Sequence, residues 1–163
     1  RQARALSADA VLAVCSPRSL AHLVRELRPV APGLRVYSSF WGFTPEFLDM
    51  AGAAAEDVVA CLPCPLGDSR SGVKEFDARF RKRFGYASSF AAVLSYEAVR
   101  VAALALESTG GDRRGVAQAL AGLGPVPGLA GDIALDRYGD VRRPTYCVQV
   151  RNGRVAPLEN GDE

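Results

Sequence analysis

The fold of this chain is decided by residues 128–155, which read GLAGDIALDRYGDVRRPTYCVQVRNGRV. They predict a short strand, a tight turn at residues 136–140 and two longer strands joined by Asn152-Gly153, because Asn-Gly between alternating apolar runs favours a β-hairpin. Large apolar side chains occupy alternate positions of residues 146–150, so one face of that strand can be buried. Since this strand cluster follows helices that themselves follow strands, we expect it to close a sheet begun earlier.

The first part of the chain predicts three strands separated by helices. Residues 10–15, 34–40 and 58–62 are the strands, and the continuous apolar run of residues 10–15 is typical of a strand buried on both faces. Ser16-Pro17 and Thr44-Pro45 start the two helices, because each places a capping hydroxyl before a proline at the first helical position. The order βαβαβ implies parallel strands with right-handed crossovers.

The middle of the chain predicts three consecutive helices. The first starts at Ser71, stops at Gly85 and carries a solvated basic face; the second is capped by Ser88 or Ser89; the third is capped by Asp112. Three helices in a row cannot all belong to the βαβ sheet. The predicted fold class is therefore α/β, with a parallel βαβ sheet, additional helices and a C-terminal β-hairpin.

Composition excludes several classes of partner. The chain has 163 residues, within the usual range of one domain, with 20 Lys and Arg against 18 Asp and Glu. This balance argues against a nucleic-acid partner and against a polybasic membrane patch. No apolar run approaches the roughly 20 residues that span a bilayer. Residues 1–6 resemble the last turns of a helix without a start signal, so we expect any targeting sequence to lie upstream.

The sequence lacks the patterns expected of an enzyme or a metal site. It contains no dinucleotide-binding, phosphate-binding or nucleophile-elbow motif, and its single histidine, His22, is predicted to face solvent. Cys61-Leu-Pro-Cys64 matches a redox motif, but it ends a strand instead of opening a helix, which favours a structural role as small apolar residues. No second pair completes a set of four metal ligands. We predict no catalysis, no cofactor and no metal.

A binding site is easier to predict, because ligands of open parallel sheets bind beyond the carboxyl ends of the strands. The candidate ligand-binding residues lie at the carboxyl ends of two of the predicted strands and are Cys15, Ser16, Ser39, Phe40 and Trp41. Their hydroxyls and aromatic rings can offer hydrogen bonds and a stacking surface to one small molecule. The alternative is that Ser16 is only a helix cap and that the aromatic residues, with Phe43, only pack beneath their loop.

The order of elements and several segments resemble the type I periplasmic binding proteins, in the branched-chain amino acid group that serves ABC transporters. The segments that carry the resemblance are residues 51–58 (AGAAAEDV), 76–85 (FDARFRKRFG), 95–98 (SYEA) and 128–140, which contain GDIALD at positions 131–136 and GD at positions 139–140. The resemblance covers nearly the whole chain.

The resemblance implies two hinged α/β lobes with a small molecule bound in the cleft between them, of which this chain is the C-terminal portion. Residues 1–62 would form a βαβ segment of the second lobe, residues 63–127 a helical segment returning to the first lobe, and residues 128–163 the strands that close the second lobe. Family ligand contacts fall near Ser16 and near residues 39–41. No carboxylate stands there for an α-ammonium group, which leaves room for an aromatic acid or an amide as well as an amino acid.

The resemblance thus predicts a non-catalytic solute-binding component of an ABC importer. Its partners would be a small molecule and the transporter permease, and it would be periplasmic or extracellular, attached to a membrane through an upstream region. The alternative is a ligand-sensing domain of a receptor or transcription regulator with the same fold. If the chain is only a part of such a protein, its middle helices expose apolar faces, and we expect them to support a homodimer.

Overall fold

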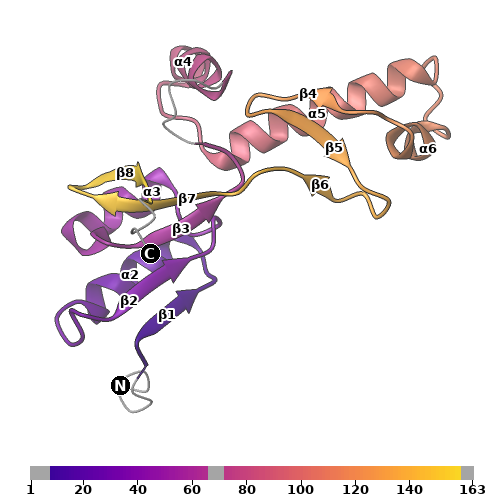
Figure 1. Cartoon of the computed structure of the whole chain (residues 1–163). Helices are drawn as coiled ribbons and strands as arrows, with labels where there is room; N and C mark the ends of the chain where they lie inside the picture. The colour runs from indigo at the N-terminus through magenta and orange to yellow at the C-terminus, as the bar shows by residue number, and fades with distance from the viewer. Residues whose placement is uncertain (1–7, 66–71, 159–163) are drawn as a thin grey trace. The chain divides into compact units, whose positions relative to one another are not determined.

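The computed structural model describes residues 8–65 and 72–158 of the chain (Figure 1). The predicted helix start at Ser71 therefore lies outside the described residues. The elements follow in the order β1 (Ala10–Ala13), α2 (Pro17–Leu27), β2 (Arg35–Ser38), α3 (Pro45–Ala51), the short 3-10 helix η1 (Gly52–Ala55), β3 (Val59–Leu62), α4 (Gly72–Phe84), α5 (Phe90–Ser108), α6 (Val116–Ala121), β4 (Val126–Pro127), β5 (Asp132–Leu135), β6 (Val141–Arg142), β7 (Tyr146–Arg151) and β8 (Arg154–Pro157).

The chain divides into two compact units. Unit 1 comprises residues 1–63 and 145–163, and unit 2 comprises residues 64–144. The chain therefore passes from one unit to the other twice. The mixed α/β architecture predicted from the sequence is confirmed, and each unit has a sheet of its own.

Unit 1 is built on a five-stranded sheet of order β1-β2-β3-β7-β8. The first three strands are parallel, as their order along the chain predicts, with Val11 opposite Val36 and Ser38 opposite Ala60. β7 joins the sheet antiparallel to β3, so the late strand does close the sheet begun earlier. β7 and β8 form the predicted hairpin, in which Asn152 and Gly153 both adopt positive φ angles of 53° and 69°. Asn-Gly is favoured at such a turn because both of its central residues need a positive φ.

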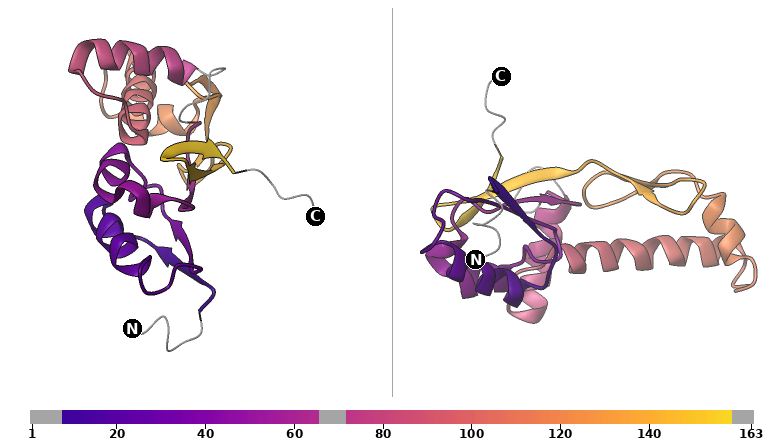
Figure 2. Two further views of the ribbon diagram at one scale, coloured as in Figure 1. Left: turned by 90° about the vertical axis from the view of Figure 1, so that its left-hand side faces the viewer. Right: turned by 90° about the horizontal axis from the view of Figure 1, so that it is seen from below.

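Helices α2 and α3 lie on the same face of this sheet (Figure 2). The helix residues Leu20, Val24 and Phe47 and the strand residue Val36 are all buried. The expectation that residues 10–15 form a strand buried on both faces is wrong. β1 ends at Ala13, and the side chains of Leu12 and Val14 are 70% and 73% exposed, because β1 is the edge strand and its second face carries no helix among the described residues.

Unit 2 combines helices α4, α5 and α6 with a three-stranded antiparallel sheet, β4-β5-β6 (Figure 1). The predicted turn joins β5 to β6, where the Asp136 carboxylate accepts hydrogen bonds from the N–H groups of Tyr138 and Asp140. α5 begins after Ser89, as predicted. The predicted cap of the third helix is wrong: α6 is preceded by Gly115, and Asp112 accepts a bond from the N–H of Arg114 in the loop before it. An aspartate capping its own turn competes with the helix for the same backbone donors.

A buried carboxylate holds unit 2 together. Glu97 of α5 is 2% exposed; its Oε1 accepts a bond from the N–H of Leu129 at 2.8 Å, and its Oε2 lies 2.8 Å from Nη1 of Arg143. The burial of Glu97 was not predicted from the sequence. A buried charge is tolerated because both carboxylate oxygens have donors.

No helix within residues 8–65 and 72–158 combines the length and the apolar character needed to cross a membrane.

Candidate functional site

The sequence-predicted site residues lie on two neighbouring loops at the carboxyl edge of the unit 1 sheet. One loop joins β1 to α2 and contains Cys15 and Ser16; the other joins β2 to α3 and contains residues 39–43. The N–H of Ser39 donates to the carbonyl of Ala13 at 3.0 Å. A Cβ atom added to Gly42 would lie 3.0 Å from the carbonyl oxygen of Cys15. The two loops are therefore in contact, as parallel neighbouring strands require.

Ser16 is engaged as a helix cap. Its backbone is extended, its Oγ accepts a bond from the N–H of Ser19 at 3.3 Å, and Pro17 follows at the first helical position. The Ser16 Oγ also lies 3.1 Å from the Ser19 Oγ, to which it donates. Since Pro17 has no N–H and the Ser19 N–H is occupied, this helix start offers fewer backbone donors to an anion than an ordinary one.

Cys15 is a free, partly buried thiol beside the same helix start. Burial raises the pKa of Cys15 above its ordinary value, so the thiol stays protonated at neutral pH. A protonated thiol acts as a small apolar group with a weak hydrogen-bond donor, not as a nucleophile.

The second loop presents an exposed aromatic ring. Trp41 is 62% exposed and stacks with Phe40, with 5.4 Å between ring centroids and 29° between planes. Phe43, in contrast, is 2% exposed and packs against Phe47. The alternative that these aromatic residues only pack beneath the loop thus describes Phe43 and not Trp41.

Ser39 carries a hydroxyl without a partner. Among the described residues, its Oγ is the one buried side-chain nitrogen or oxygen that makes no hydrogen bond. Its neighbour Ser38 is also buried, but the Ser38 Oγ donates to the carbonyl of Ser39 at 2.8 Å. Buried hydroxyls in folded proteins are normally paired, so an unpaired one next to a binding edge marks a place for a further polar group.

The charges nearest in sequence to the two loops neutralise each other. Arg18 in the first turn of α2 and Glu46 in the first turn of α3 form an exposed ion pair with 3.0 Å between Nε and Oε1. The Glu46 carboxylate is thus already paired with a cation from the neighbouring helix.

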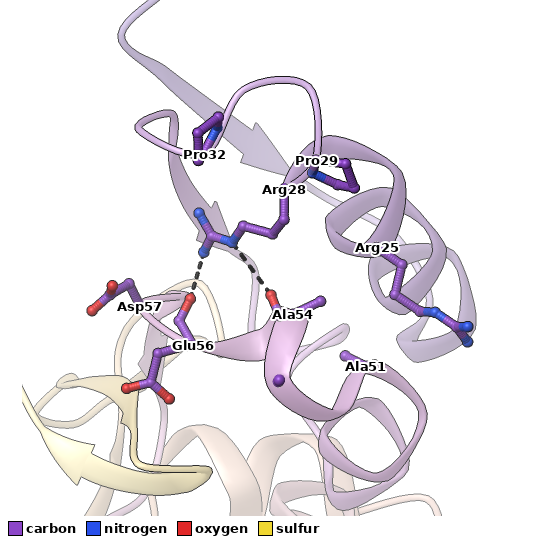
Figure 3. A pocket seen from close by; sticks show the side chains of 9 residues that line it. Arg25, Arg28, Pro29, Pro32, Ala51, Ala54, Glu56 and Asp57 are labelled. Atoms are coloured by element: carbon purple, nitrogen blue, oxygen red, sulfur yellow. Dashed lines mark hydrogen bonds between the residues drawn. The ribbon is translucent and has the colours of Figure 1, made fainter.

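A hollow lies at the opposite end of the sheet, where loops enter β2 and β3. Its volume is about 540 Å³, and its lining includes Arg25, Arg28 and Glu56 (Figure 3). The Arg28 guanidinium donates to the carbonyls of Leu34 and Ala54, at 3.2 and 3.4 Å, and to that of Glu56. All three of its nitrogens are therefore used to hold the loops of unit 1 together.

The Glu56 side chain, like that of Arg28, makes hydrogen bonds to backbone groups of unit 1. Its two carboxylate oxygens accept bonds from the N–H groups of Asn152 and Gly153, at 2.9 and 3.3 Å. These two bonds lower the pKa of Glu56 below its ordinary value. We interpret this hollow as a structural junction.

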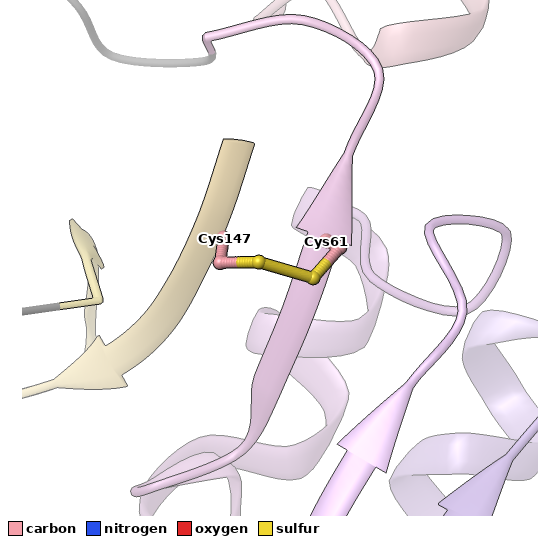
Figure 4. Close-up of a disulfide and its surroundings, with 2 residues drawn as sticks. All are labelled: Cys61 and Cys147. Atoms are coloured by element: carbon pink, nitrogen blue, oxygen red, sulfur yellow. A yellow bond between two sulfur atoms is a disulfide. The ribbon is translucent and has the colours of Figure 1, made fainter. Parts of the chain in front are cut away.

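The cysteines pair in a way that the sequence analysis missed. Cys61 of β3 and Cys147 of β7 are directly opposite each other and form a disulfide (Figure 4). The Cys61-x-x-Cys64 redox pair is therefore not formed, and the interpretation of Cys61 as a small apolar strand residue is wrong. Cys64 is fully buried, and burial together with the Glu97 carboxylate raises its pKa to about 11. Only the register of β3 and β7 could have revealed the pairing, because the sequence does not indicate which two of the four cysteines are bonded.

No cluster of three or more His, Cys, Asp or Glu side chains able to hold a metal occurs in the part of the chain that the structure describes.

Comparison with known proteins identifies the family. The model of a family described as periplasmic binding protein matches residues 1–154. This chain belongs to the periplasmic binding protein family. The resemblance to type I periplasmic binding proteins predicted from the sequence is confirmed.

Solved structures with similar folds include several proteins of ABC transporters. A leucine-binding protein, LivK, from Thermotoga maritima superimposes with a TM-score of 0.85 at 22% identity, covering 96% of this chain and 45% of that one. A solute-binding protein from R. palustris in complex with benzoate gives 0.84 at 16% identity, with coverages of 96% and 44%. The LivJ protein of Streptococcus pneumoniae in complex with isoleucine gives 0.76 at 21% identity, with coverages of 90% and 42%. The chain thus spans less than half the length of these proteins.

Proposed function

We propose that this chain supplies one side of the ligand site of a solute-binding protein of an ABC importer, which binds a small molecule without transforming it. The observation that supports the proposal best is the contact between the two loops that follow β1 and β2. Through it, Cys15, Ser16, Ser39, Phe40 and Trp41 lie at one edge of one sheet. An exposed ring and a nearby hydroxyl without a partner are suited to holding a ligand by stacking and one hydrogen bond.

The chemistry of this edge favours an aromatic acid or an amide over an amino acid. Glu46 is paired with Arg18, which leaves an α-ammonium group no unpaired partner on that helix start. The start of α2 has lost backbone donors to Pro17 and to the Ser16 cap, so it holds a carboxylate weakly; this applies equally to aromatic acids and amino acids and favours only the amide. Apolar contact with Trp41 and Phe40 therefore supplies the largest share of binding at this edge. Of the related proteins, one was solved with benzoate and another with isoleucine, so both ligand classes occur on this fold.

The proposed partners are the small molecule and the permease of the transporter, in a periplasmic or extracellular location. The disulfide between Cys61 and Cys147 supports an oxidising compartment, because disulfides persist there and are rare in the cytosol. The attachment to a membrane through an upstream region and the alternative function as a sensor domain stay predictions.

Self-association of the 163-residue chain is a further part of the proposal. Phe84, Tyr86, Tyr96 and Val99 of unit 2 are between 41% and 69% exposed. Exposed apolar side chains in such numbers favour association. Sedimentation velocity of the chain is expected to show a dimer that dissociates on dilution, and a monomer at all concentrations would contradict this part.

The ligand is tested with a panel of aromatic acids, amides and amino acids on the complete protein. Trp41 is the only tryptophan of these 163 residues, so binding at this edge should change its fluorescence. We expect an aromatic acid or amide to change the fluorescence and to raise the melting temperature, since a ligand that binds the native state stabilises it. The Trp41→Phe variant identifies the Trp41 contribution by difference. If no compound of the panel changes either the fluorescence or the melting temperature, the result counts against a solute-binding role. A compound that raises the melting temperature without changing the Trp41 fluorescence would bind elsewhere.

A further inference from the structure

Two short connections carry the chain between the units, and both start from the same pair of strands. β3 ends at Leu62 and unit 2 begins at Cys64; unit 2 ends at Pro144 and β7 begins at Tyr146. Leu62 and Tyr146 are opposite each other and form the last pair of the β3–β7 ladder. The outgoing and the returning connection therefore leave unit 1 side by side.

The disulfide lies one residue pair inside this point. Cys61 and Cys147 are directly opposite in the ladder, with a Cα–Cα distance of 4.1 Å and a sequence separation of 86 residues (Figure 4). The whole of unit 2, residues 64–144, lies within the loop that the disulfide closes. The bond thus joins the two connections covalently at their unit 1 ends.

Side chains anchor the same connections at their unit 2 ends. Cys64, the first residue of unit 2, is fully buried. Arg143, one residue before the end of unit 2, is paired at 2.8 Å with the buried carboxylate of Glu97. Pro63 and Pro144 lie between the anchors, and proline fixes the backbone φ angle. Few backbone bonds are therefore left to rotate in either connection.

We propose that the Cys61–Cys147 disulfide is a redox-sensitive clamp on both connections. Its reduction makes the two connections between the units more flexible, while unit 1 stays folded. The pairs Val59–Gln149 and Ala60–Val148 of the β3–β7 ladder lie away from the connections and hold β7 in the sheet without the disulfide, and the buried residues of α2 and α3 stay in place. The proposal goes beyond ligand binding and does not depend on the identity of any ligand.

The reduction is ordinary thiol–disulfide exchange with a dithiol. Both cysteines are exposed, so a reductant can reach a sulfur atom. The dithiol attacks as a thiolate and forms a mixed disulfide. Its second thiol then closes an intramolecular disulfide and releases the protein as two thiols, with two electrons and two protons transferred in total. The Cys64 thiol does not compete for Cys61, because it is buried and its raised pKa keeps it protonated.

Hydrogen exchange of the full chain before and after reduction by dithiothreitol tests the proposal. We expect the N–H groups of residues 62, 64 and 145–147 to exchange about tenfold faster or more after reduction, while those of α2 change less than about twofold. The Cys61→Ser/Cys147→Ser variant should reproduce the reduced pattern without a reductant. If that variant fails to fold, alkylation of the reduced wild-type protein gives the same comparison.

The matched control is Cys64→Ala, which removes the nearby thiol but keeps the disulfide. It should retain the full response to dithiothreitol, and a lost response would show that the clamp depends on Cys64. Equal exchange before and after reduction would overturn the proposal. So would faster exchange throughout β1, β2 and α2, because the disulfide would then stabilise the whole unit instead of its connections.

Discussion

At the end of the unit 1 sheet where the parallel strands begin, Arg28 donates hydrogen bonds to three backbone carbonyls and Glu56 accepts bonds from two backbone N–H groups. At the end where the strands stop, the Ser39 hydroxyl has no partner among the described residues and the Trp41 ring is 62% exposed. The first end contains the hollow of about 540 Å³, yet the charged groups of Arg28 and Glu56 in its lining are bonded to backbone carbonyls and N–H groups. The difference indicates that a candidate binding edge is recognised by a hydroxyl without a hydrogen bond and by an exposed aromatic ring, and not by the size of a hollow.

Among the changes that test this comparison, replacement of Arg28 is expected to have the largest effect, which is a loss of stability. Arg28→Met keeps the apolar stem but leaves the carbonyls of Leu34, Ala54 and Glu56 without their donor. We expect the free energy of unfolding to fall by about 3 kcal/mol, since bonds from a charged donor are worth more than neutral ones. Urea denaturation measures it. Arg25→Met, at an exposed position lining the same hollow, is the control and should change stability by less than about 0.5 kcal/mol.

A methyl group on Gly42 tests the contact between the two loops. In Gly42→Ala the new Cβ would meet the Cys15 carbonyl and the Ser38 Oγ at 3.0 Å, so the loops must move apart. We expect a loss of about 1–3 kcal/mol in stability, together with weaker ligand binding. The matched control is Gly33→Ala, where nothing lies within 4 Å of the added atom. Equal stability of both variants would mean that the loops tolerate separation and that their contact does not define the site.

Removal of the exposed ring separates binding from stability. Trp41→Ala should weaken ligand binding by about tenfold, because a stacked aromatic contact is worth about 1 kcal/mol or more. Its effect on unfolding should stay within about 0.5 kcal/mol, as for other exposed side chains. Calorimetric titration gives the affinity. Tyr138→Ala, at a 73% exposed ring in unit 2, is the control that should leave the affinity unchanged.

The two neighbouring serines of β2 and its loop offer a finer test. Ser39→Ala removes a buried hydroxyl without a partner, so stability should remain equal or rise by a few tenths of a kcal/mol while the affinity falls a few-fold. Ser38→Ala removes a hydroxyl that donates to the Ser39 carbonyl, so it should cost about 1 kcal/mol in stability. The opposite pattern would show that the Ser39 hydroxyl has a structural role.

The smallest effect on stability is expected from acidification, through Glu56 at the end of the sheet where the parallel strands begin. The bonds from Asn152 and Gly153 lower the pKa of Glu56 in the folded state, so the ionised carboxylate stabilises that state. This contribution is present above the ordinary pKa of glutamate and is lost as the pH falls through the lowered value. Glu56→Gln should therefore be less stable than the wild-type protein at pH 6, and the difference should shrink towards pH 3. A difference that is independent of pH would contradict this origin.

The sequence predicted the elements that depend on local signals. Ser16-Pro17 starts a helix because a hydroxyl and a proline satisfy its first turn, and Asn152-Gly153 forms a hairpin because both residues accept positive φ angles. The candidate site residues could be placed on two loops because parallel strands bring their carboxyl ends to one edge. The roles of those residues in binding stay predictions, because they depend on the ligand.

The features that the sequence could not predict all depend on partners far away in the chain. Leu12 is exposed because β1 lies at the edge of the sheet, although its apolar neighbours indicate a buried strand. Glu97 is buried because Leu129 and Arg143 reach it from 32 and 46 residues away. Neither position carries a local signal of its environment.

The amino-acid sequence by itself determined the order of the strands and helices of unit 1, the starts of α2 and α3, the Asn152-Gly153 hairpin and the parallel order of the first three strands. These properties follow from side-chain periodicity and from the backbone preferences of Ser, Pro, Asn and Gly. Only the tertiary structure decided that Cys61 is bonded to Cys147, that the Arg28 guanidinium donates to three backbone carbonyls, and that the Ser39 hydroxyl makes no hydrogen bond within the described residues. The physical reason is that hydrogen-bond satisfaction and disulfide pairing depend on distances between atoms, which strand register and packing set.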